Sequence, residues 1–190
     1  MHRRTPLLVV AILLTDITTI SCGDEPSRGT NPVGPTGLMD TMGGGMSMTV
    51  VSEFDYLTRV IPHHQEAIAT AGLLQRGSQR AELRAFAASI VTTQSAEVAQ
   101  MNAWLATWYP GRDTRVDYQP MMRELTGLTG GALDKAFLED TIPHHMMAVM
   151  MSQQLIVRNL AQHPAVMSFA ANIRDTQRAE IQMMTAWLRE

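Results

Sequence analysis

The segments VIPHHQEAIATA (residues 60–71) and TIPHHMMAVMMS (residues 141–152) share the motif Ile-Pro-His-His at an offset of 81 residues. Four of the chain's six histidines lie in these two copies. The same offset matches further apolar residues, Ala67 with Ala148 and Leu74 with Leu155. The repetition predicts one structural unit present twice, with the histidines serving a purpose in both copies.

A second pair of similar segments follows the motifs, at an offset of 83 residues. The matched pairs are Phe86 and Phe169, Ile90 and Ile173, Gln94 and Gln177, Glu97 and Glu180, Met101 and Met184, and Trp104-Leu105 and Trp187-Leu188. Their steps of three and four place them along one side of a helix. The change of offset is what a difference in loop length would produce. We therefore expect an all-α fold over residues 51–190, in which two helical hairpins form one four-helix bundle.

Turn-forming residues separate the expected helices. Gly77-Ser78 and NLAQHP (residues 159–164) lie inside the two hairpins, and YPGRDTRVDYQP (residues 109–120) begins a longer connection between them. Pro62 and Pro143 lack the backbone N–H that a helix interior needs, so we expect each proline to kink or to start its helix beside the histidines.

Length and charge narrow the class of protein. A chain of 190 residues suits one domain that buries its own core. Its 15 Lys and Arg stand against 18 Asp and Glu, which gives a formal charge of -3. A protein that neutralises phosphates needs a basic face. We therefore expect no nucleic-acid partner.

Residues 1–22 have the features of a signal peptide, with two arginines near the start, an apolar run, and a small residue before Cys22. The letters TISC resemble the lipobox of bacterial lipoproteins, so Cys22, the only cysteine, is the expected lipid anchor. The expected location is the bacterial cell envelope, periplasmic or extracellular. Asp16 and Thr19 depart from the usual lipobox pattern. They leave secretion without a lipid, or an uncleaved anchor, as alternatives.

Residues 23–50 are rich in Gly, Pro and Thr and show no apolar period, so we expect a flexible linker. This segment carries four methionines, Met39, Met42, Met46 and Met48. A linker has no core for such side chains to fill. Either their thioethers catch soft metal ions or their number reflects drift in composition.

Helical periodicity gives the four repeated histidines different directions. His64 and His145 each continue an apolar line of their helix and should point into the core, whereas His63 and His144 should flank it. A buried imidazole needs a partner, because an unsatisfied polar group costs about 1–3 kcal/mol. The inward carboxylates and amides are the candidates, namely Gln94, Glu97, Gln177 and Glu180. Hydrogen bonding that locks helix pairing therefore competes with metal ligation for the inward histidines, and ligation is expected of the flanking ones.

Methionines accompany the histidines in the second copy. His144, Met147 and Met151 follow at steps of three and four, on one side of the helix, whereas the first copy has Glu66 and Thr70 at the matching positions. Imidazole and thioether without cysteine suit copper, Cu(I) more than Cu(II), so we expect the second copy to dominate binding. The candidate metal ligands are His63, His64, His144, His145, Met147 and Met151.

The duplicated IPHHQEAIATA and IPHHMMAVMM, each followed by a helix with the pattern Q..E...M..WL, resemble the domain of unknown function 305 family, which includes CopM-like periplasmic copper-binding proteins. The similarity covers about residues 53–188. It implies a ferritin-like four-helix bundle in the bacterial cell envelope, with copper bound through His and Met in some members. This chain has Val60, Thr70 and Thr141 where the family favours methionine. The first copy therefore lacks thioethers that the second keeps, which argues against two equal sites.

These features predict a non-catalytic, exported copper-binding protein that buffers the ion, provides resistance to it, or passes it on as a metallochaperone. The sequence names no protein partner. One alternative is a structural or interaction bundle without metal, whose histidines are core hydrogen-bonders. The other is a ferritin-like enzyme with a dinuclear iron or manganese site made from Glu97, Glu180 and the inward histidines, although such sites normally supply Glu-x-x-His on two helices.

Overall fold

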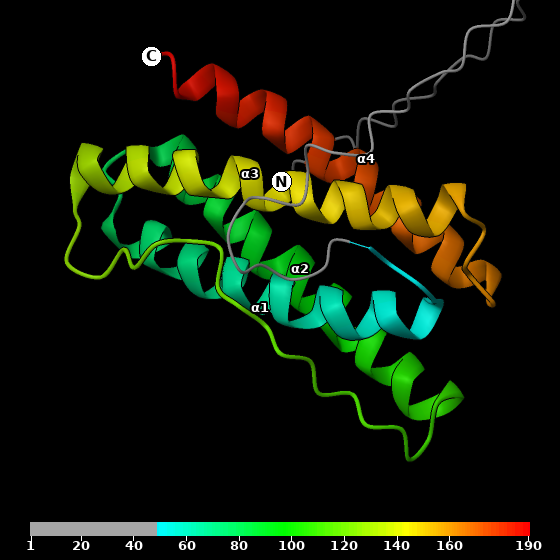
Figure 1. Ribbon diagram of the computed structural model, residues 1–190. Coiled ribbons are helices and arrows are strands. Elements are labelled where there is room, and N and C mark those ends of the chain that lie inside the picture. The colour runs from blue at the N-terminus through cyan, green and yellow to red at the C-terminus, as the bar shows by residue number, and fades with distance from the viewer. Residues whose placement is uncertain (1–48) are drawn as a thin grey trace, which may run out of the picture. The chain divides into compact units, whose positions relative to one another are not determined.

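The computed structural model describes residues 49–190, and within them the chain forms four α-helices and no strand (Figure 1). The helices are α1 (Glu53–Gly77), α2 (Ala81–Trp108), α3 (Gly130–Val157) and α4 (Pro164–Trp187). The predicted all-α, four-helix bundle of two hairpins is confirmed. None of these four helices has both the length and the apolar composition that crossing a bilayer demands. The expected signal peptide and most of the expected linker, residues 1–48, lie outside the described residues.

The ends of α1 follow from its sequence. The hydroxyl of Ser52 accepts a hydrogen bond from the backbone N–H of Asp55, and acidic residues in the first turn complement the helix dipole. At the other end the N–H of Ser78 donates to the carbonyl of Leu74. Both α1 and α3 continue through their internal prolines, Pro62 and Pro143, so neither proline starts a helix.

The two hairpins meet where α1 crosses α3 (Figure 1). α1 packs against α2, α3 packs against α4, and short turns at residues 78–80 and 158–163 join each pair. α1 and α3 run antiparallel, because the Tyr56 hydroxyl near the start of α1 lies 2.9 Å from the Ser152 hydroxyl near the end of α3. Residues 109–129 connect the hairpins and run back along α1.

Two apolar clusters fill the bundle, and the histidine motifs lie between them. Cluster 1 includes Ala67, Leu74, Phe86, Leu133, Phe137 and Leu138. Cluster 2 includes Tyr56, Leu57, Val60, Met101, Ala148, Met151 and Leu155. Along α1 the histidines occupy the interval between Val60 and Ala67, and along α3 the interval between Leu138 and Ala148. A polar layer therefore lies between the two apolar clusters.

A buried carboxylate ties the ends of both hairpins together. Glu53, in the first turn of α1, is fully buried. Its oxygens accept hydrogen bonds from the Tyr109 hydroxyl at 2.9 Å, the Gln162 N–H at 2.6 Å, the His163 N–H at 2.8 Å and His163 Nδ1 at 2.6 Å. Burial alone would raise the pKa of Glu53, but these bonds together lower it below its usual range. The start of α1 is thus joined to the end of α2 and the start of α4.

Candidate metal centre

Four histidines meet in the middle of the bundle. His63, His64, His144 and His145 are each at most 1 % exposed. The rings of His63 and His144 stack, with centroids 3.7 Å apart and planes inclined by 24°. The prediction that this pair flanks the core is wrong, because α3 covers the side of α1 that carries His63 and α1 covers His144 in return.

His64 and His145 contact the second helix of their own hairpin. Nε2 of His64 lies 2.9 Å from Oε2 of Glu97, and Nε2 of His145 lies 2.9 Å from Oε2 of Glu180. The second contact is an aligned hydrogen bond, whereas the Glu97 oxygen lies off the direction in which the His64 ring nitrogen points. The expected placement of these glutamates beside the inward histidines is confirmed, with a hydrogen bond at His145 and a close contact at His64.

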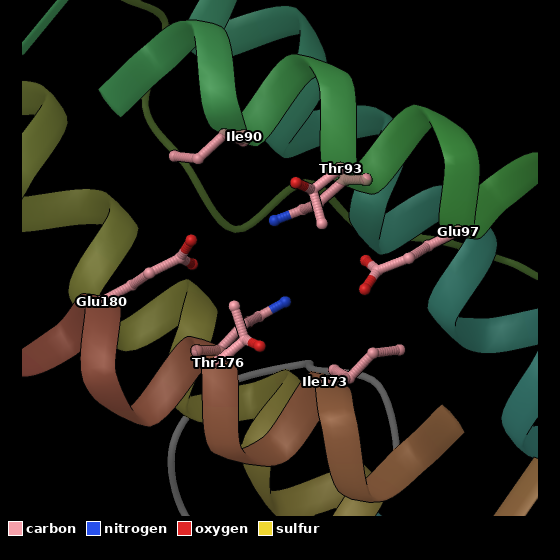
Figure 2. Close-up of a pocket in the computed structure, with 8 residues that line it drawn as sticks. Ile90, Thr93, Glu97, Ile173, Thr176 and Glu180 are labelled. Atoms are coloured by element: carbon pink, nitrogen blue, oxygen red, sulfur yellow. The ribbon is translucent and has the colours of Figure 1, made fainter. Parts of the chain in front are cut away.

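Glu97 and Glu180 also line a small pocket between α2 and α4 (Figure 2). Periodicity predicted that both carboxylates lie inside the bundle. Each side chain is instead 16 % exposed, so the carboxylates lie at the edge of the bundle. Figure 2 shows Thr93 facing Thr176 across the pocket, with one glutamate toward each end. Solvent therefore reaches the carboxylates that contact the inward histidines.

Glu66 of α1 joins the stacked pair to the long connection between the hairpins. Its Oε2 lies 3.2 Å from Nε2 of His144 and accepts a hydrogen bond from the Tyr118 hydroxyl. Its Oε1 accepts the backbone N–H of Met121 at 2.8 Å and of Met122 at 2.9 Å. Burial alone would raise the pKa of Glu66, but His144 and the other donors lower it overall. The carboxylate is thus held as an anion beside His144.

Burial keeps the stacked pair uncharged. Loss of hydration lowers the pKa of His63 well below 6.5, and the nearby histidines lower it further. Burial also lowers the pKa of His144, although Glu66 opposes this effect. Both imidazoles are therefore neutral at pH 7, and each keeps one nitrogen with the lone pair that a metal ion requires.

Most ring nitrogens of the cluster lack an aligned hydrogen-bond partner. They are both nitrogens of His63, His64 and His144, and Nδ1 of His145. A buried polar atom without any partner costs about 1–3 kcal/mol, so an ion that paired with these nitrogens would offset such a cost. Imidazole nitrogen suits copper, so the donor set fits such an ion. Within residues 49–190 no three His, Cys, Asp or Glu side chains are already arranged around one point, so the rings must turn to hold an ion.

The candidate thioethers lie beside the histidine layer, in its apolar surroundings. Met151 is 5 % exposed and belongs to cluster 2, and the half-buried Met147 packs against that cluster. By contrast, Met146 is 42 % exposed. Along α3, Met147 and Met151 lie about one and two helical turns after His144. The linker methionines lie outside the described residues, namely Met39, Met42, Met46 and Met48.

Comparisons with known proteins agree with this fold. The family model for the domain of unknown function DUF305 matches residues 53–188. CopM in its Cu(I)-bound form has a TM-score of 0.65 and 27 % sequence identity, covering 74 % of this chain and 97 % of that one. CopM in its Cu(II)-bound form has a TM-score of 0.65 and 27 % identity, covering 73 % and 97 %. A DUF305 fragment from Deinococcus radiodurans has a TM-score of 0.64 and 27 % identity, covering 74 % and 97 %. No curated protein matches the sequence.

Proposed function

The chain belongs to the DUF305 family, and on that premise we propose that it is an exported protein that binds copper with histidine and methionine side chains. The observation that carries the proposal is the layer of buried histidines, most of whose ring nitrogens have no aligned hydrogen bond. The similarity to CopM, which has been solved with Cu(I) and with Cu(II), supports copper as the ion.

His63 and His144 are the first ligands, because they come from different hairpins and their rings are already in contact. His64 and His145 follow, each beside a glutamate that can orient its ring as an outer partner of the metal site. Met147 and Met151 complete the set from α3, and their thioethers favour Cu(I) over Cu(II). The stacking favours one shared centre over a centre confined to the second copy.

The ion is cargo for binding and release, not part of a catalytic apparatus. The pocket between α2 and α4 offers a way in and out past Glu97 and Glu180, whose carboxylates contact both solvent and the inward histidines. A signal peptide over residues 1–22 would export the chain, and a lipid on Cys22 would hold it at the cell envelope. Buffering of copper, resistance to it or its transfer to another protein would each use this arrangement.

The proposal is tested by titrating the protein with Cu(I) under reducing conditions, in competition with a chelator of known affinity. We expect a dissociation constant below about 1 μM, which corresponds to about −8 kcal/mol. His63→Ala and His144→Ala should each weaken binding at least tenfold, or about 1.4 kcal/mol, because both rings serve one centre. Gln100→Ala, on an exposed position of α2, is the matched control and should leave affinity unchanged.

Other outcomes separate the alternatives. A loss confined to His144→Ala would place the ion within the second hairpin. Unchanged affinity in both histidine variants would indicate that the ion binds outside the bundle, at the linker methionines. Absence of binding tighter than about 1 μM would contradict the proposal and leave the histidines as core hydrogen-bonders.

A further inference from the structure

His163 differs from the central histidines in its exposure. It lies in the turn before α4, and its side chain is 34 % exposed, whereas the four central histidines are at most 1 % exposed. We propose that His163 and Met167 form a second, surface metal site that takes Cu(I) or another soft monovalent ion. This site shares no residue with the central layer and does not depend on copper binding there.

Glu53 fixes which ring nitrogen of His163 is free. Nδ1 lies 2.6 Å from Oε1 of Glu53. The same carboxylate already accepts bonds from the Tyr109 hydroxyl and from the N–H groups of Gln162 and His163. A carboxylate with these donors around it acts as an acceptor, so Nδ1 carries the ring proton and Nε2 keeps the lone pair. In metal sites this carboxylate–histidine pair orients the ring and raises the basicity of the ligand nitrogen.

The ring of His163 is also fixed across its face. It stacks on the indole of Trp108, with centroids 3.7 Å apart and planes inclined by only 6°. A bond at one edge and stacking on one face leave the ring little freedom to lose. An ion that binds at Nε2 therefore causes little further loss of conformational entropy, because the fold already orders the ring.

The start of a helix ordinarily disfavours a cation, because the free N–H groups there carry partial positive charge. At α4 this effect is offset by Glu53. The N–H groups of Gln162 and His163 already donate to the Glu53 carboxylate, which brings a full negative charge to the same place. The local field therefore does not oppose a monovalent cation.

A groove beside the ring supplies the second ligand. His163 and Met167 both line it, together with residues that include Gln162 and Pro164. The N–H of Met167 donates to the carbonyl of His163 at 3.4 Å, which sets the two residues one helical turn apart at the start of α4, and both border the same groove. Glu53, saturated by its four donors, is not available as a hard oxygen ligand. An imidazole nitrogen and a thioether are the donors that Cu(I) and Ag(I) prefer.

The test uses Ag(I) as a redox-inert probe on the whole chain, with Cys22→Ser to remove the only thiol. Nitrogen-15 NMR of the histidine rings reports each site separately. We expect the Nε2 resonance of His163 to shift on addition of Ag(I), and to shift in the same way in the His144→Ala variant. Loss of binding at the central layer alone would therefore leave this response intact.

Met167→Leu is the decisive variant, because it keeps the ring, the bonds to Glu53 and nearly the same side-chain volume. It should weaken Ag(I) binding at His163 at least tenfold. His163→Gln should abolish the site and lower the number of bound ions by one. Three results would overturn the proposal: an Nε2 resonance that does not move, a Met167→Leu affinity equal to the parent's, or a stronger response to Zn(II) than to Ag(I).

Discussion

The four central histidines differ in what their rings touch. His64 and His145 each have a carboxylate oxygen at 2.9 Å, whereas His63 has the ring of His144 as its neighbour, with 3.7 Å between centroids. Removing a carboxylate should therefore lower the stability of the fold where a buried ring nitrogen is left without a neighbouring oxygen.

Replacing Glu97 or Glu180 by Ala should lower the free energy of unfolding by on the order of 2 kcal/mol, because a fully buried histidine loses its partner. Urea unfolding of the single variants measures the change. Gln100→Ala, at an exposed position of α2, should change stability by less than about 0.5 kcal/mol. Losses as small as that in the glutamate variants would show that these carboxylates do not support the histidines.

The stacked pair should make the ion-free protein sensitive to mild acid. The pKa values of His63 and His144 are lowered in the folded protein, whereas an unfolded histidine titrates near 6.5. The unfolded chain therefore binds more protons below pH 6.5. The stability present above that pH is lost as pH falls toward the lowered values, with a slope of up to about 1.4 kcal/mol per pH unit for each ring.

Urea unfolding across this pH range, in the presence of a metal chelator, measures the slope. His63→Leu removes one of the two titrating rings and is the comparison. Its stability should depend less steeply on pH below about 6.5. A slope equal to that of the parent would assign the acid sensitivity to other groups.

The connection between the hairpins depends on one side chain of α1. Glu66 accepts the N–H groups of Met121 and Met122 as well as the Tyr118 hydroxyl. Glu66→Ala should therefore release this segment, and the two amides should exchange hydrogen with solvent at least about tenfold faster. Tyr118→Phe removes a single bond and should have a smaller effect. Unchanged exchange in Glu66→Ala would mean that burial of Met122 and Leu125 holds the connection alone.

Local patterns predicted the helices and turns, because an apolar stripe and the residues that break it lie in one stretch of sequence. The same stripes placed Glu97 beside His64 correctly, since both residues belong to one hairpin. They misplaced His63 and His144, because periodicity in one helix does not show whether a distant helix covers its other side. Contacts of Glu66 with Met121 and Met122 were missed for a related reason: residues of an irregular connection carry no period that would indicate their partner.

An ion held by His63 and His144 would link the two hairpins, so binding should stabilise the whole fold. At a free Cu(I) concentration about 100 times the dissociation constant, the expected gain is about 2.7 kcal/mol. Thermal unfolding in chelator-buffered Cu(I) measures it, and His63→Ala should lose most of the gain. Binding without any rise in Tm would assign the ion to a part of the chain that remains unchanged when the bundle unfolds.

Glu53 leaves the ribosome long before the groups that bury it. Its partners Gln162 and His163 follow 109 and 110 residues later. Until they emerge, the carboxylate stays hydrated, and the end of the bundle that it closes remains open. α1 and α2 can pair early as a local hairpin, but the nascent chain completes its fold only when nearly all of it has been translated. The same delay would suit the export proposed above, because a translocation channel threads a polypeptide that has not yet folded.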